Sequence, residues 1–200
     1  MGIFAGHEAF GRSRLPRGVG RPEPGGRASR KGELEIEEQI EIMGNLPSAA
    51  ERIAVLHADY YGRNWGFGAI FHDQILTAAS AFLERFDPRR DGFWTVCLQG
   101  QVAGAIAIDG IHADTEGAHL RWFILGESLR GRGLGNRLLA RAIAFGRECG
   151  HSRIYLWTFE GLQTARHLYE KYGFALVAAR PGSQWGKEVI EQRFVLDLTV

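Results

Sequence analysis

The sequence contains few cysteines, almost no net charge and no long apolar run. Its two cysteines, Cys97 and Cys149, lie far apart among 200 residues and lack the neighbouring ligands of a metal site, so we expect buried reduced thiols and no bound metal. The formal net charge is +1, so the overall charge points to no class of charged partner. The absence of about 18 consecutive apolar residues, and of an apolar segment after the basic start, argues against a membrane span and a secretory signal. We therefore expect a cytoplasmic protein with no membrane partner.

Residues 1–45 differ in composition from the rest of the chain and are expected to form a leader. Residues 1–32 are rich in glycine, arginine and proline and have little to bury, so we expect them to be disordered. The acidic stretch ELEIEEQIEIM, residues 33–43, fits a short strand or an amphipathic helix equally well. The basic leader is the one segment that suits nucleic acid, and the nearly neutral remainder argues against that partner.

Residues 46–200 have the composition and patterning of one globular α/β domain. Alternating or continuous apolar runs predict strands at 52–57, on both sides of Gln99-Gly100 within 92–109, and at 118–125, 153–158, 174–179 and 189–198. Helical periodicity predicts helices at 69–86, 134–149 and 162–172, whereas 59–67 fits a loop or a short helix. This order predicts a mixed sheet flanked by helices.

The segment RGRGLG, Arg130 to Gly135, lies between a predicted strand and a predicted helix, where a phosphate group can be bound. A P-loop requires Gly-Lys-Ser/Thr, but the segment contains no lysine and Asn136 follows its last glycine. A dinucleotide fingerprint requires GxGxxG, but the third glycine comes one residue early. The remaining pattern, Arg-x-x-Gly-x-Gly, suits a pyrophosphate bound by backbone N–H groups without a metal.

The order of these segments resembles the GNAT superfamily of acyl-CoA-dependent N-acyltransferases. The resemblance rests on LRWFIL, RGRGLG, the following helix, RIYLWT and ARHLYEKYGF, and it covers most of residues 50–198. RFDPRRDGFWTVCLQGQVAGAI and EQRFVLDL further resemble the acetyltransferase module that is fused to MarR-type regulators. The resemblance implies the GNAT fold, acetyl-CoA as cosubstrate and an amine acceptor, and a homodimer is one oligomeric state that it allows.

The resemblance also implies which residues bind the acyl donor. The backbone of Phe123, Ile124 and Leu125 is expected to pair with the pantetheine amides, where strands 119–125 and 153–158 diverge. The pyrophosphate is expected to bind at the segment formed by Arg130, Gly131, Arg132, Gly133, Leu134, Gly135 and Asn136, with the two arginines adding charge at its rim.

Tyr169 matches the tyrosine that, in many GNAT members, hydrogen-bonds the CoA sulfur and protonates the departing thiolate. One departure concerns the end of the second strand of the pair. The fused modules commonly read Trp-Thr-Asn, whereas this chain has Trp157-Thr158-Phe159. The change either weakens a contact with CoA or reshapes the acceptor mouth.

The acceptor amine is mostly an ammonium at neutral pH, so a group must take up its proton before attack. The candidates near the expected cleft are Asp109, His112, His119, Glu127 and Glu160, among which Glu127 and His119 rank first. The aromatic residues Tyr60, Tyr61, Trp65, Phe67, Trp94 and Trp185 fit core packing better than a lining of the acceptor side.

The sequence therefore predicts transfer of an acetyl group from acetyl-CoA to a primary amine by direct attack in a ternary complex. Because the base is not identified and Phe159 departs from the pattern, a non-catalytic acyl-CoA-binding module stays as the alternative.

Overall fold

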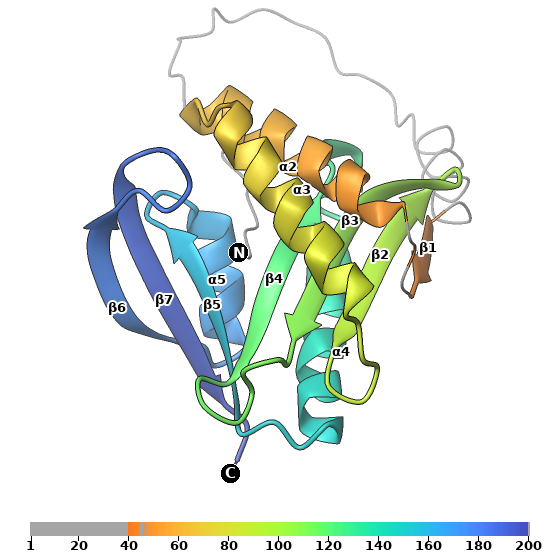
Figure 1. The fold of residues 1–200 in the computed structure, drawn as a ribbon, viewed down its shortest axis with the longest axis vertical. Helices are drawn as coiled ribbons and strands as arrows, with labels where there is room; N and C mark the ends of the chain where they lie inside the picture. Colours follow the sequence, from red (N-terminus) through yellow and green to blue (C-terminus); the bar gives the residue numbers. More distant parts are fainter. Residues whose placement is uncertain (1–39, 45, 47, 200) are drawn as a thin grey trace, which may run out of the picture.

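A seven-stranded mixed sheet runs through the part of the chain that the computed structural model describes, residues 40–44, 46 and 48–199 (Figure 1). Its strands are β1 (Ile40–Met43), β2 (Gly92–Leu98), β3 (Gln101–Asp109), β4 (Ala118–Leu125), β5 (Arg153–Phe159), β6 (Ala175–Gly182) and β7 (Val189–Asp197). The helices are α2 (Ala49–Trp65), α3 (Ala69–Glu84), α4 (Leu134–Glu148) and α5 (Gln163–Lys171), with a 3₁₀ turn, η1, at Glu127–Leu129. The predicted mixed sheet flanked by helices is confirmed.

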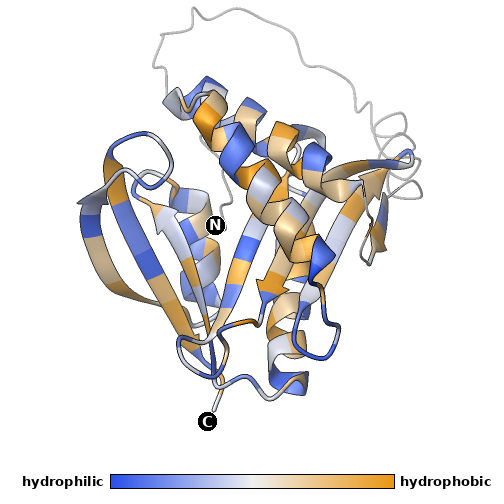
Figure 2. Cartoon of the chain, in the orientation of Figure 1, coloured by the Kyte–Doolittle hydropathy of each residue, from blue (hydrophilic) through white to orange (hydrophobic). Residues whose placement is uncertain are grey.

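The strand order is β1-β2-β3-β4-β5-β7-β6, in which β4 and β5 form the one parallel pair of the described sheet. Figure 1 shows α2 and α3 across one face of the β2–β4 half, with α4 and α5 on the opposite face. The front of β5, β7 and β6 has no helix over it in this view. Figure 2 shows hydrophobic colour where the helices meet the sheet, so the apolar core lies between these layers.

The prediction of a strand at 52–57 was wrong, because these residues belong to the 17-residue helix α2. Its buried residues Ile53, Ala54, His57 and Tyr61 recur at helical spacing, and Gly66 ends the helix in the left-handed region at φ 69°. The helix continues through 59–65, where a loop was the alternative. Six residues are too few to distinguish the two-residue alternation of a strand from the roughly 3.6-residue period of a helix.

The other predicted elements of residues 69–198 are confirmed within a few residues. Gln99 and Gly100, both with positive φ, form the tight turn of the predicted β2–β3 hairpin. Residues 40–43 of the acidic stretch form β1, which pairs with β2, whereas the expected disorder of residues 1–32 lies outside the described residues. The boundary at 45 stays a prediction. No described helix is long and apolar enough to cross a membrane.

A buried histidine makes the stability of this fold depend on pH. His57 of α2 has no exposed surface, its Nδ1 lies 2.9 Å from the Ile53 carbonyl oxygen, and its Nε2 has no hydrogen-bond partner. Burial lowers the pKa of His57 from 6.5 to about 4, so the folded protein holds the neutral imidazole.

We expect acid to destabilise the wild-type protein more than the His57→Leu variant. The unfolded chain takes up a proton on His57 below pH 6.5 and the folded protein does so below about pH 4, so stability falls as the pH falls through this window. Urea unfolding at pH 7 and pH 5 should show an additional loss of about 2 kcal/mol in the wild type. All other groups titrate in both proteins, so equal losses would contradict this role of His57.

Candidate active site

The strands β4 and β5 pair at their beginnings and then separate. Their register consists of Ala118 with Ile154 and His119 with Tyr155, although both strands continue for several residues (Figure 1). The second half of β4 therefore offers backbone groups on its β5 side that are not used by this pair. Phe123, Ile124 and Leu125, the predicted contacts of the pantetheine, lie in this half of β4, beyond its register with β5.

A bulge in β4 lies at the start of the separation. Ala105 pairs with Ile124 and Ala107 with Arg121, so Trp122 and Phe123 both lie opposite Ile106. Trp122 has φ 48°, which is rare for a bulky residue, and its side chain is fully buried. A bulge of this kind turns a strand out of its ladder and often lies beside a functional site. The sequence analysis missed it, since no glycine marks the position.

The glycine segment after β4 forms an anion-binding geometry at the start of α4. Gly131 and Gly133 have φ 74° and 72°, and a Cβ on either would meet no protein atom within 4 Å. Gly133 is the N-cap residue and no side chain caps the helix, so the first backbone N–H groups after it remain available to an anion. These features fit the predicted pyrophosphate group.

A cavity of about 380 Å³ connects this segment to α5 and to the end of β4. It is lined by Leu125, Leu129, Arg130, Gly131, Gly133, Leu134, Gly135, Asn136, Thr164, His167, Leu168 and Lys171. Lys171 Nζ donates a hydrogen bond of 2.9 Å to Asn136 Oδ1, and the Tyr172 hydroxyl donates one of 3.0 Å to the Asn136 carbonyl. We call this space the donor cavity. Thr164, His167 and Lys171 were not predicted from the sequence, because their place beside the loop depends on how α5 packs.

The side chains of Arg130 and Arg132 turn back onto the loop that carries them. Arg130 donates two hydrogen bonds of 3.3 Å to the Leu125 carbonyl and lies 4.5 Å above the Tyr60 ring. Arg132 Nε donates one of 3.1 Å to the Ser128 carbonyl. Both arginines therefore brace the turn between β4 and α4, and both contribute positive charge near the donor cavity.

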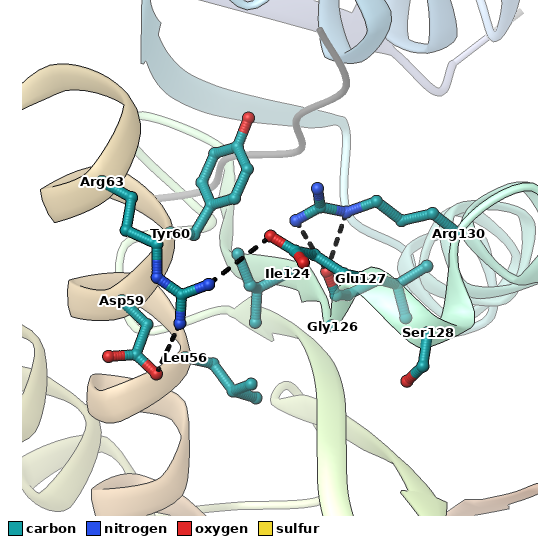
Figure 3. A pocket seen from close by; sticks show the side chains of 10 residues that line it. Leu56, Asp59, Tyr60, Arg63, Ile124, Gly126, Glu127, Ser128 and Arg130 are labelled. Carbon is teal, nitrogen blue, oxygen red and sulfur yellow. Dashed lines mark hydrogen bonds and ion pairs between the residues drawn. The ribbon is translucent and has the colours of Figure 1, made fainter.

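A second cavity of about 400 Å³ lies between α2 and the end of β4 (Figure 3). Arg63 lies there between Asp59, at 3.6 Å, and Glu127, at 3.7 Å, and Glu127 keeps 69% of its side chain exposed. The second cavity shares Leu125 and Arg130 with the donor cavity. Glu127 thus lies beside the donor cavity, on the face of α2 that carries Tyr60.

Tyr169 of α5 lies in the core behind the separated strands. It has no exposed surface, its ring centre lies 6.3 Å from that of Phe123, and its hydroxyl has no hydrogen-bond partner. Burial raises the pKa of Tyr169 far above 10, so its phenol stays protonated. A buried hydroxyl without a partner is costly, and a bound ligand is one way to satisfy it.

Tyr61 of α2 is a second buried phenol that was predicted only as a core residue. It has no exposed surface, its hydroxyl has no hydrogen-bond partner, and burial together with Tyr169 raises its pKa well above 10. Since α2 and α5 lie on opposite faces of the sheet, the two phenols approach each other where β4 and β5 have separated. Two protonated phenols thus lie near each other in the core beside this separation.

Phe159 closes one side of this opening. It is 1% exposed and lies within an aromatic cluster, which we define as Tyr61, Trp65, Phe67, Phe71, Phe159 and Trp185. Lys187 of the β6–β7 loop also reaches this cluster, through the Trp65 carbonyl and the Phe67 ring. The phenylalanine that departs from the Trp-Thr-Asn pattern therefore faces α2 and α3 and shapes the mouth on that side. The core packing expected for Tyr60, Tyr61, Phe67, Trp94 and Trp185 is confirmed.

His119 lies where the paired segment of β4 and β5 ends, on the face that carries α2 and α3. Its ring stacks on Tyr155 at 4.4 Å and an angle of 14°. Burial, with a smaller effect of Arg121 and Arg193, lowers the pKa of His119 well below 6.5, so the imidazole is neutral at pH 7. The structure thus places His119 on this face of the opening and Glu127 beside the donor cavity. In the described part of the chain, no three His, Cys, Asp or Glu residues gather as a metal site would require.

Comparison with known proteins assigns the family. The model of the acetyltransferase (GNAT) family matches residues 51–174, which is more than half of the chain. The chain belongs to this family. As a GNAT acetyltransferase it uses acetyl-CoA, for which the uncapped helix α4 and the donor cavity provide a fitting site.

Similar proteins support the assignment to different extents. An N-acetylaspartate synthetase of Danio rerio is 33% identical over 90 residues, which cover 45% of this chain and 32% of that protein. The match thus spans about a third of the length of the relative. Among solved structures, the putative acetyltransferase yncA of Salmonella typhimurium with its cofactor acetyl-CoA has a TM-score of 0.61 at 18% identity, covering 80% of this chain and 95% of that one. A chimera of the spermidine N-acetyltransferase SpeG from Vibrio cholerae and hSSAT has a TM-score of 0.60 at 17% identity, and the match covers 80% of this chain and 95% of that one. The structural likenesses show the GNAT fold.

We expect Gly133→Ala to weaken acetyl-CoA binding by tenfold or more. A Cβ with φ near 72° is strained, and relaxation would turn the following N–H groups away from the pyrophosphate. Gly150→Ala is the matched control, because Gly150 follows the other end of α4 with the same φ of 72° and the same open space. Calorimetric titration should find similar losses of stability in both variants but weaker binding in Gly133→Ala alone. Equal affinities would contradict the role of this glycine.

Proposed function

We propose that this GNAT domain transfers the acetyl group of acetyl-CoA to a primary amine by direct attack in a ternary complex. The observation that carries the proposal is the pair of buried, unpartnered phenols, Tyr169 and Tyr61, at the opening between β4 and β5. One phenol comes from the side of the donor cavity and the other from the side of α2 and α3. This arrangement suits a reaction in which the donor and the acceptor approach from opposite faces of the sheet.

In the donor half, the segment Gly131–Asn136 binds the pyrophosphate through backbone N–H groups at the start of α4. The β5-facing edge of β4 at Phe123 to Leu125, beyond the register with β5, binds the pantetheine amides as an added strand would. The Leu125 carbonyl, which accepts two hydrogen bonds from Arg130 in the free protein, then accepts from a pantetheine amide instead. The bound acetyl-CoA supplies an activated acyl carbon.

Tyr169 acts as the proton donor for the leaving sulfur. Because burial raises its pKa, the phenol remains protonated at every pH at which the protein is expected to work. A thiolate of pKa about 8.5 leaves readily, so this proton is a modest contribution to the rate. Tyr61 offers its hydroxyl on the acceptor side.

His119 is the group that we propose as the proton acceptor for the ammonium. It is neutral at pH 7, and it lies on the face of the sheet that also carries Tyr61. Its place at the start of the opening makes a relay through water the expected route. Glu127 is exposed, held by Arg63 and directed toward another face of α2, so we place it beside the donor rather than the amine.

Thiol release measures this activity directly. Acetyl-CoA is incubated with the protein and a panel of amines, and free CoA is measured against samples that lack amine. The panel includes aspartate, after the name of the zebrafish relative, and spermidine, after that of the chimera. No amine-dependent release, together with tight acetyl-CoA binding, would favour the acyl-CoA-binding module instead. The cytoplasmic location, the likeness to modules fused to MarR-type regulators, the homodimer and the lack of a nucleic-acid partner stay predictions.

Tyr169→Phe should lower kcat by about tenfold or more, because the leaving thiolate loses its proton donor. The KM for acetyl-CoA should change less than about threefold, since the contacts of the donor segment remain. Tyr60→Phe is the matched control: it removes a phenol one residue from Tyr61 and keeps the ring beneath Arg130. Equal kcat values for the wild type and Tyr169→Phe would overturn the assignment.

His119→Gln and Glu127→Gln should have different effects on turnover. We expect His119→Gln to lower kcat by tenfold or more, because general bases contribute about 10² or more to such rates. Glu127→Gln should change kcat less than about threefold, because this carboxylate contacts Arg63 and not the face of α2 that carries Tyr61. Asp59→Asn, which removes the other partner of Arg63, is the control for Glu127→Gln. The reverse order of effects would reassign the base to Glu127.

A further inference from the structure

One arginine of the sheet lacks a carboxylate partner. The described strands carry four arginines, of which Arg121 pairs with Asp109 at 2.8 Å, Arg153 with Asp197 at 3.9 Å and Arg180 with Glu191 at 3.8 Å. Arg193 of β7 is the fourth, and no carboxylate among the described residues forms an ion pair with it. Its charge is therefore left without a local counterion.

The guanidinium of Arg193 is held in place and partly dehydrated. The residue is half-buried, its guanidinium lies 4.6 Å from the centre of the Tyr155 ring, and its Nε has no hydrogen-bond partner. The Nε of Arg121, on the same face, also has no partner. Arg121 and Arg193 both contribute to lowering the pKa of His119, so the two guanidiniums lie around the same ring. Buried donors without acceptors are costly, and one anion would satisfy both.

These arginines lie on the acceptor side of the opening. Arg193 pairs across the sheet with Trp157, and paired residues point to the same face. Phe159, two residues beyond Trp157, touches Tyr61, so the backbone of Arg193 lies about 7 Å along the sheet from the strand position that Tyr61 contacts. Arg121 is two residues beyond His119 on β4 and lies on the same face.

The local environment favours a small anionic group over a large polyanion. Figure 1 shows α3 beside this part of the sheet, and the β6–β7 loop reaches the aromatic cluster at its far end. Figure 2 shows hydrophilic segments of β4 and β7 set between hydrophobic ones. The charged area is thus flanked by the aromatic cluster, whose member Phe159 lies two residues beyond Trp157 on β5.

We propose that Arg193, assisted by Arg121, binds an acidic group of the acceptor, so that the acceptor is a small amine that also carries a carboxylate. The inference rests on the proposed acetyl transfer and adds the substrate class and the residue that selects it. The carboxylate supplies the counterion that Arg193 lacks, and its oxygens accept from the two unpartnered Nε atoms. The amine is then directed toward Tyr61 and the acyl carbon.

Pairs of acceptor amines that differ only in whether they carry a carboxylate or a neutral carboxamide test this proposal. Each amino acid, such as glycine, β-alanine or aspartate, is compared with its carboxamide by thiol release. The wild type should favour the acid over the amide by about tenfold or more in kcat/KM, since hydrogen bonds between charged groups contribute about 1.5–3 kcal/mol. Arg193→Gln should abolish this preference, mainly by raising KM for the acid by roughly 10–100-fold, and should leave the KM for acetyl-CoA unchanged.

Two further variants separate recognition from stability. Arg193→Lys keeps the charge and should retain part of the preference. Arg180→Gln is the matched control, because Arg180 also covers an aromatic ring of β5, Trp157 at 5.2 Å, but already has Glu191 as its partner. Equal losses in Arg193→Gln and Arg180→Gln, or equal use of acids and amides by the wild type, would overturn the inference while the acetyl transfer stands. If no amine is acetylated, the proposed function itself fails.

Discussion

The separation of β4 from β5 is the constraint on which the rest of the site depends. Two residue pairs join the strands, and the bulge at Trp122 and Phe123 then turns β4 away. Without this separation, the backbone of Phe123 to Leu125 would be used up in a continuous ladder. The sheet would also keep the two phenols apart, since α2 and α5 pack on opposite faces. The irregular half of one strand thus underlies both the proposed donor-binding edge and the approach of the two phenols.

The two halves of the proposed site differ in whether backbone or side-chain groups form them. The donor half consists mainly of backbone: a strand edge, two glycines with positive φ and the uncapped start of α4. The proposed acceptor half consists of side chains, among them Tyr61, His119 and Arg193, which come from separate elements. Backbone geometry tolerates many sequences, whereas a set of side chains selects one ligand chemistry. This difference explains how one fold serves unrelated acceptors.

The elements around the proposed donor half could be predicted from the sequence because their signals are local. Glycine spacing, the periodicity of α4 and the order of strands around it lie within some forty residues, and the structure has these elements where they were expected. The acceptor half depends on contacts between distant segments. In the sequence, Tyr61 is one aromatic residue among several. Its proposed role depends on its nearness to Tyr169, which comes more than a hundred residues later in the chain. The strand wrongly predicted at 52–57 had the same cause, because a short apolar window carries too little of a helical period.

The two residue pairs between β4 and β5 also bear on how the molecule holds together. Because so few backbone pairs join β4 to β5, the described sheet is nearly divided into two hydrogen-bonded parts, β1–β4 and β5–β7. Beyond these pairs, the halves are joined by side-chain contacts, among them the aromatic cluster of α2, α3, β5 and the β6–β7 loop and the hydrogen bond from Lys187 to the Trp65 carbonyl. Close-packed rings hold their neighbours in fixed positions much as a ladder of hydrogen bonds does. The cluster therefore takes over, at this end of the sheet, the joining that the paired residues of β4 and β5 perform at the other.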